Sequence, residues 1–206
     1  MELLPLTFAS GWASGLNAWA TVLVLGLLGR FAHVGEVPTG FQRADVLIVM
    51  AVLATIELLA DKIPLLDSTW DAASTVVRPV AGAVIAALIA GQTGSLTTIA
   101  LASIGGVSAL LSHITKSGLR LAINTSPEPV SNVAASVAND VSLVTVLALA
   151  AEHPVPAAVL AGVLLVTGLV LFALVFTQIR RGVAMVRRNL AGLRGSTERG
   201  MHEDGR

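Results

Sequence analysis

Six apolar runs, each long enough to cross a membrane as a helix, make up most of this chain. They lie at about residues 9–29, 44–63, 76–91, 95–121, 130–150 and 155–179. A helical bilayer crossing needs about 20 mostly apolar residues. Only 13% of the residues are charged, against about a quarter in soluble domains. The pattern predicts an all-α, polytopic transmembrane helical bundle and excludes a soluble domain.

Two parts of the chain, residues 57–79 and 113–132, are more polar than the spans around them. Each is predicted either as a surface connection or as a re-entrant hairpin. A re-entrant backbone is tolerated at membrane depth only where protein or water surrounds it. The sequence leaves both readings open, and the number of spans depends on the choice.

Two short segments read alike and indicate an internal repeat of helix pairs. Thr75-Val-Val-Arg78-Pro79-Val80 and Thr125-Ser-Pro-Glu128-Pro129-Val130 both fit Thr-x-x-(Arg/Glu)-Pro-Val. Each copy is predicted to start a helix, with Arg78 and Glu128 as paired mates. Six spans make the repeats parallel, and a re-entrant hairpin makes them inverted. Chance similarity among common residues is the alternative.

The C-terminal segment is strongly basic and sets the expected orientation. Lys and Arg near helix ends favour the cytoplasmic side, so we expect this end in the cytoplasm and, after six spans, the N-terminus there too. Residues 1–179 form the predicted membrane domain, and residues 180–206 a basic amphipathic to disordered tail. Anchoring at a membrane explains the charge better than nucleic-acid binding does. The arginines are Arg180, Arg181, Arg187, Arg188, Arg194, Arg199 and Arg206.

Three acidic residues fall within apolar runs and form a predicted cation or proton site. Glu57 and Asp61 lie four residues apart, so they share one helix face. Asp140 lies near the middle of the run 130–150. A carboxylate at membrane depth is costly unless it is paired or hydrated, so it is a functional candidate by default.

Basic residues provide the predicted counterpart. His113, Lys116 and Arg120 recur at spacings of three and four, and with Arg78 they are candidates for charge balance or for anion binding. The alternative is that the stripe reaches to the membrane surface along its apolar stems. Five further side chains are predicted to give the site a polar lining: Asn17, Asn124, Glu128, Asn132 and Asn139.

The segment Asp67-Ser-Thr-Trp70-Asp71 is predicted as an interfacial loop, with Asp71 or Ser74 capping the next helix. Helix starts near Pro79 and Pro129 would leave free N–H groups, which attract anions.

No motif indicates a cofactor or a familiar type of catalysis. The chain has no cysteine, which excludes disulfides and thiolate metal sites. A weaker alternative is an intramembrane enzyme that acts on lipid headgroups. A divalent ion bound between Glu57, Asp67 and Asp71 would favour it.

At these residues the chain resembles a family of small bacterial membrane proteins known as "domain of unknown function 4126". The resemblance implies a multi-pass protein of the bacterial inner membrane and no established activity, substrate or cofactor. It rests on Ala13-Ser-Gly-Leu-Asn-Ala18, Glu57-Leu-Leu-Ala-Asp-Lys-Ile-Pro64, Trp70-Asp71, Arg78-Pro-Val-Ala-Gly82 and Asn124-Thr-Ser-Pro-Glu-Pro-Val-Ser-Asn132.

The leading functional prediction is a small transporter or channel-like permease for an ion or small charged solute. The alternative is a structural or lipid-interacting membrane protein whose charges are internal pairs and whose tail holds anionic lipid. A homo-oligomer is also expected, with Gly11-x-x-x-Gly15 as a candidate contact because small residues four apart let helices approach closely.

Overall fold

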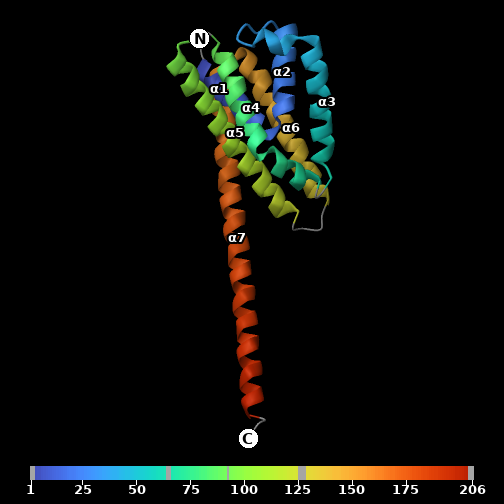
Figure 1. Ribbon diagram of the computed structural model, residues 1–206, viewed down its shortest axis with the longest axis vertical. Coiled ribbons are helices and arrows are strands. Elements are labelled where there is room, and N and C mark those ends of the chain that lie inside the picture. Colours follow the sequence, from blue (N-terminus) through green and yellow to red (C-terminus); the bar gives the residue numbers. More distant parts are fainter. Residues whose placement is uncertain (1–2, 64–65, 92, 125–128, 204–206) are drawn as a thin grey trace.

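A computed structural model describes residues 3–63, 66–91, 93–124 and 129–203 of the chain. The described backbone is helical and contains no strand, which confirms the all-α prediction (Figure 1). Its elements are α1 (Leu3–Leu16), α2 (Ala18–Phe31), the 3-10 turn η1 (Thr39–Gln42), α3 (Ala44–Ala60), α4 (Leu66–Ala90), α5 (Ser95–Ile123), α6 (Pro129–Glu152) and α7 (Pro154–Glu203).

Four helical segments are long and apolar enough to cross a membrane. They are Leu66–Ala90, Ser95–Ile123, Ser131–Glu152 and Pro154–Gly182. Many large apolar side chains on the outside of the bundle are exposed, including Ile48, Val52, Val141 and Val163. A soluble protein would bury such a surface, whereas lipid solvates it. These features are those of an integral membrane protein.

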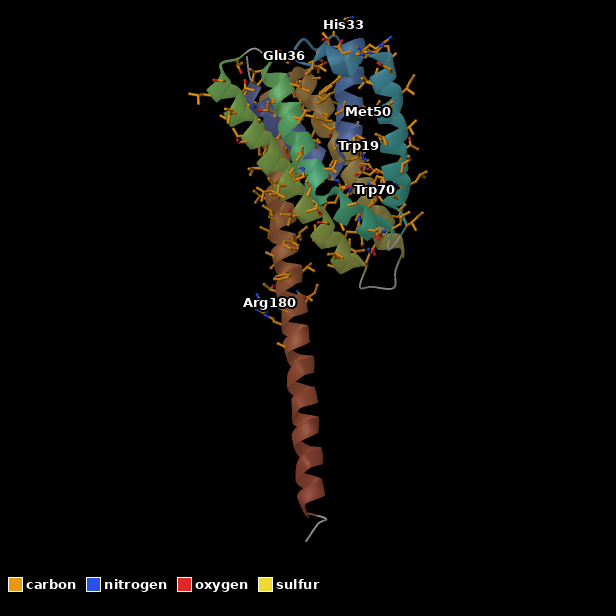
Figure 2. The ribbon with its side chains drawn as sticks, viewed as in Figure 1. Trp19, His33, Glu36, Met50, Trp70 and Arg180 are labelled. Atoms are coloured by element: carbon orange, nitrogen blue, oxygen red, sulfur yellow. The ribbon has the colours of Figure 1, made fainter. Side chains whose placement is uncertain are left out.

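The two ends of the bundle hold different connections (Figure 1). The upper end holds the start of α1, residues 32–43 and the connection between α4 and α5. The lower end holds the connection between α3 and α4, the end of α5 and the start of α6. Helix α7 leaves the bundle at the lower end, and Arg180 lies on the part that projects (Figure 2).

The first predicted span, residues 9–29, is not one helix. Asn17 has an extended backbone (φ −157°, ψ 107°) and separates α1 from α2. Leu3 and Gly35 line the same pocket at the upper end, and Trp19 lies midway down the bundle in Figure 2. The α1–α2 hairpin therefore enters from the upper end, turns inside the bundle and returns.

This hairpin bears on two expectations, and neither is confirmed. Six spanning segments are not confirmed, and the start of α1 and the projecting part of α7 lie at opposite ends of the bundle (Figure 1). The expectation that both termini share one side assumed an unbroken first helix. Re-entrant hairpins at residues 57–79 and 113–132 are not confirmed either, since residues 66–79 lie in α4 and residues 113–123 in α5.

The internal repeat is not confirmed. Thr75–Val80 lies inside α4, and Pro79 is within that helix and not at its start. The free N–H groups expected at Pro79 are therefore absent from this part of α4. In the second copy, residues 125–128 lie outside the described residues, and with them the predicted pairing of Arg78 with Glu128.

Glycines bring α1, α4 and α5 into close contact. A Cβ added at Gly11 would lie 2.6 Å from the Gly105 Cα, and one at Gly82 would lie 2.6 Å from the Ala109 Cβ. Gly15 faces the Ala109 backbone and the Ser112 side chain in the same way. The Gly11-x-x-x-Gly15 pattern therefore packs within the chain, against α5, and is not free to form the expected oligomer contact.

The polar groups at the break have local partners. Asn17 Oδ1 accepts a hydrogen bond from the Ala20 N–H (2.9 Å), and the Thr21 hydroxyl donates to the Asn17 carbonyl (2.8 Å). Asn17 is thus the N-cap of α2, and it is buried. A side chain that accepts from the first turn is what lets a helix begin inside an apolar bundle.

Replacing Asn17 with leucine is expected to lower the free energy of unfolding by about 1–2 kcal/mol, because the first turn of α2 loses its acceptor. Asn17→Ser keeps an acceptor oxygen and should lose less. Unfolding by SDS in mixed micelles, followed by circular dichroism, measures both. Equal stability of the Ser and Leu variants would contradict the capping role.

Candidate functional site: a buried charge network

Eight titratable side chains from α3, α4 and α5 meet inside the bundle, and we call them the charge network. All are buried, and the most exposed of them, Lys116, has only 5% of its surface accessible. The members are Glu57, Asp61, Asp67, Asp71, Arg78, His113, Lys116 and Arg120.

Helical periodicity aligns these side chains on three facing surfaces. His113, Lys116 and Arg120 form the predicted stripe on α5, and Glu57 and Asp61 lie on one face at the end of α3. The close packing of α4 on α5 through Gly82 and Gly105 brings the stripes together. Burial rules out the alternative that the α5 stripe reaches to the membrane surface.

Helix α4 begins earlier in the chain than the sequence predicts. Residues 67–71 were expected in an interfacial loop, but α4 begins at Leu66 and buries Asp67 and Asp71 on the face that also carries Arg78. Neither Asp71 nor Ser74 caps the helix. The spacing of four and then seven between these three residues is a helical signal, which Pro64 and the nearby charges obscured.

Arg78 is the centre of the part of the network nearest the hairpin. Its Nη2 lies 2.6 Å from Glu57 Oε1 and forms a hydrogen-bonded ion pair. The same nitrogen lies 2.9 Å from Asp71 Oδ1, an ion pair without hydrogen-bond geometry. Its Nη1 lies 2.7 Å from His113 Nδ1.

Asp61 and Arg120 are the centre of the other part. Lys116 Nζ lies 2.6 Å from Asp61 Oδ2, and Arg120 Nη1 lies 2.9 Å from Asp61 Oδ1. Arg120 also lies near Asp71 (3.1 Å) and Asp67 (3.6 Å). The Asn124 side-chain amide donates to both Asp67 oxygens at 3.1 Å, so it closes the network toward the lower end.

The hydrogen bonds assign a neutral state to His113. A guanidinium only donates, so His113 Nδ1 accepts from Arg78, and the ring proton lies on Nε2, 3.3 Å from the Thr75 hydroxyl. The Thr75 hydroxyl in turn donates to the Asp71 carbonyl (3.1 Å). His113 therefore orients Arg78 and does not supply the positive charge expected of it.

The broken end of α1 also belongs to the site. Lys116 Nζ donates to the Leu16 carbonyl (2.7 Å), and Arg78 Nη1 donates to the Gly15 carbonyl (3.4 Å). The last carbonyls of a helix have no partner within it and carry partial negative charge. Two cations of the network therefore stabilise the end of α1, a role that spacing along the sequence does not reveal.

The formal charges of the network do not balance. It contains four carboxyl groups and, among the described residues, three cations that touch them: Arg78, Lys116 and Arg120. His113 is neutral, and the α1 carbonyls add partial negative charge. With every carboxyl ionised, the network would hold one uncompensated negative charge in a buried place, which is costly.

Asp140, predicted to share a cation or proton site with Glu57 and Asp61, lies outside the charge network. Its Oδ2 is 3.4 Å from Lys62 Nζ, and both side chains are more than a quarter exposed. Lys62 also contacts Ser136 (3.5 Å). Lys62 follows Asp61 directly, but nothing in its sequence spacing indicates this contact with α6.

The remaining predicted polar residues have different surroundings. Asn132 is 1% exposed, and neither of its side-chain polar atoms has a hydrogen-bond partner among the described residues. Asn132, Ser136 and Asp140 follow one another at intervals of four on α6 and so share one face. Glu128 lies outside the described residues.

No group of acidic or histidine side chains in the described part of the chain is arranged to hold a metal ion. Arginine and lysine nitrogens lie between the carboxylates where a divalent ion between Glu57, Asp67 and Asp71 would need to bind.

A cavity of about 460 Å³ lies beside the network, between α5, α6 and α7, with α1 at one end. Most of its wall is apolar, from residues such as Leu119, Leu164 and Leu171. Lys116, Arg120 and Asn139 also line it.

Comparison with known proteins gives one family match. The model of a family described as a domain of unknown function (DUF4126) matches residues 4–174. No curated protein and no solved structure matches the chain.

Proposed function

The chain belongs to the DUF4126 family, and from its buried site we propose that it is a small permease that binds a proton in the charge network and moves it across the membrane together with a small charged solute. The family description supplies no activity, so the proposal rests on the geometry and charge of this chain.

The observation that carries the proposal is the imbalance of buried charge. Four carboxyl groups share three cations in a place closed to solvent. A proton on one carboxyl removes the uncompensated charge, so the network is a binding site for a proton at the depth of the helices. Intramembrane carboxylates of this kind form proton relays in pumps and transporters.

Glu57 is the best candidate to carry this proton. Asp61 and Asp71 each lie within 3.1 Å of two cations, whereas Glu57 has Arg78 at 2.6 Å and Lys116 at the longer distance of 3.8 Å. Asp67 has one longer ion pair, with Arg120 at 3.6 Å, but both of its oxygens accept hydrogen bonds from Asn124, which a proton there would disturb. Among the carboxyls that contact two cations, Glu57 therefore has the fewest short ion pairs, and a proton on Glu57 disturbs only the short pair with Arg78.

Two further features support movement of an ion. Helices broken at membrane depth are typical of transporter binding sites, and α1 and α2 are broken beside Lys116 and Arg78. The polar face of α6, with Asn132, Ser136 and Asp140, is a candidate route from the lower end. The arginines of the C-terminal segment favour a cytoplasmic location for this end.

Proton flux into liposomes tests the proposal. Vesicles containing the protein and a trapped pH dye are energised by a potassium diffusion potential, with and without a panel of small organic acids and amines outside. We expect internal acidification faster than in protein-free vesicles, and a return to the protein-free rate in Glu57→Gln. Asp45→Asn, an exposed acid paired with Arg43 at the upper end, should behave as wild type.

Stability supplies the second measurement. Glu57→Gln keeps an oxygen that can accept from Arg78 and removes the excess negative charge, so we expect it to unfold at the same SDS fraction as wild type or a higher one. Wild-type vesicles that match protein-free vesicles under every solute would overturn the permease.

The close pairing of the network supports one alternative, a structural protein that does not transport. Arg78, Lys116 and Arg120 each contact at least two acidic groups. If these pairs serve only the fold, Glu57→Gln should lower stability and leave vesicle flux at the protein-free rate in all variants.

A further inference from the structure

We propose that the cavity between α5, α6 and α7 binds an amphipathic carboxylate with a single apolar chain, of the fatty-acid type. This inference rests on the proposed function and names its solute class, since the bound carboxylate would be the solute that moves with the proton. Binding is measured without flux, so the two can fail separately.

The shape of the cavity suits one apolar chain. Its lining runs along α5 from Ser112 to Ile123, a length of roughly 16 Å at the rise of an α-helix. Leu119, Leu164 and Leu171 supply apolar wall. A volume of about 460 Å³ lies in the range of small-molecule sites, roughly 300–1,000 Å³.

Hydroxyl groups on the wall are already used within the protein. Ser112 donates to the Trp12 carbonyl (2.7 Å), and Ser142 donates to the Ala138 carbonyl (2.7 Å). Lys116 also lines the cavity, but its Nζ already donates to Asp61 and to the Leu16 carbonyl. The side chains of Arg120 and Asn139 therefore define the polar part of the cavity.

Arg120 has one nitrogen to spare. Its Nη1 contacts Asp61 and Asp71, but its Nη2 is buried and has no hydrogen-bond partner among the described residues. A buried donor without a partner is costly, and Arg120 also lines the cavity. Arg120 therefore belongs both to the charge network and to the cavity wall, and its Nη2 is the donor that a ligand oxygen at this wall would satisfy.

Asn139 lies across the same cavity on α6. Its amide can donate to a second ligand oxygen, and an arginine N–H with an amide N–H suits the two oxygens of a carboxylate. A carboxylate beside a network with an excess negative charge would be repelled, and a proton on Glu57 removes that excess. Carboxylate and proton are therefore expected to bind together.

Quenching of Trp12 fluorescence by 9,10-dibromostearic acid tests the site, because bromine quenches tryptophan at short range and Trp12 lines the cavity. The protein is studied in full length in lipid nanodiscs. We expect saturable quenching that is lost in Trp12→Phe, where Trp19 and Trp70 remain. Quenching that is linear in concentration, or unchanged in Trp12→Phe, would overturn the proposal.

Two variants of α6 form a matched pair. Ala138→Phe fills the cavity with a ring and should raise the concentration for half-maximal quenching by about tenfold or more. Val141→Phe adds a ring to the same helix at a residue that is 59% exposed, and we expect wild-type quenching. Equal effects of the two variants would contradict binding in the cavity.

The polar end is tested with ligands and with Asn139. The methyl ester of dibromostearic acid and a dibrominated phosphatidylcholine carry similar chains without a free carboxylate. We expect the acid to bind more tightly than either, and Asn139→Leu to weaken the acid about tenfold with little change for the ester. Equal quenching by the acid, ester and phospholipid would mean that the cavity takes lipid chains without selecting a carboxylate.

The flux assay then separates the two proposals. Saturable, carboxylate-selective quenching in a protein that moves no protons would leave the binding site standing and remove the permease. Proton flux that responds to other solutes, without quenching by dibromostearic acid, would support the permease and remove the proposed binding site.

Discussion

Arg78→Gln will destabilise the protein by about 3–5 kcal/mol, the usual cost of removing one partner from a buried ion pair. Arg78 is 1% exposed and lies 2.6 Å from Glu57 and 2.9 Å from Asp71. Without the guanidinium, both carboxylates stay buried next to each other with less compensation, and the Gly15 carbonyl loses a donor. Unfolding in SDS mixed micelles, followed by circular dichroism, measures the loss.

A second substitution shows that charge causes this loss. In Glu57→Gln/Arg78→Gln one of the two stranded carboxylates is gone, so the double variant should be more stable than Arg78→Gln alone. Arg43→Gln removes an exposed arginine whose pair with Asp45 lies in solvent, and exposed pairs add little to stability. We therefore expect no change there. A double variant that is no more stable than Arg78→Gln would contradict the pairing.

Gly15→Ala is expected to separate α1 from α5 and to lower the free energy of unfolding by about 1–3 kcal/mol, the range for overpacking a tight contact. An added Cβ would meet the Ala109 carbonyl and the Ser112 side chain, and the Ala109 backbone cannot move aside easily. Movement of α1 away from α5 would also separate the Leu16 carbonyl from Lys116 Nζ. The same SDS titration measures this change in the free energy of unfolding.

Gly162→Ala is the matched control on α7. A Cβ there would meet Phe8 only at 4.0 Å, an ordinary contact. We expect this variant to be at least as stable as wild type, since alanine favours a helix over glycine. If Gly15→Ala matched Gly162→Ala, the close approach of α1 to α5 would not matter for stability.

The part of the site that the sequence predicted rests on local helical geometry. Residues three or four apart share a face wherever the chain is helical, so the α5 stripe and the pair Glu57 and Asp61 could be recognised without tertiary structure. Asp67 and Asp71 could not, because Pro64 and the charges around it read as a loop, whereas both residues lie in α4, which packs against α5.

Asp140 shows what helix position alone leaves undetermined. Its position near the middle of an apolar run suggested the deepest acid of the protein, yet it lies at an edge beside Lys62. A position within a helix gives depth along the bundle but not distance from its axis. Which side of α6 faces the other helices depends on contacts that the sequence does not encode locally.

The sequence by itself determined the class of the protein, because long apolar helices are the structures that satisfy their own backbone in lipid. It also placed cations and carboxylates on helix faces that were able to meet. The tertiary structure decided the break at Asn17. The break leaves the carbonyls of Gly15 and Leu16 without partners in α1. Arg78 and Lys116, which are distant in sequence, donate hydrogen bonds to them. It also decided the unequal count of buried charges, since burial depends on how three helices pack together.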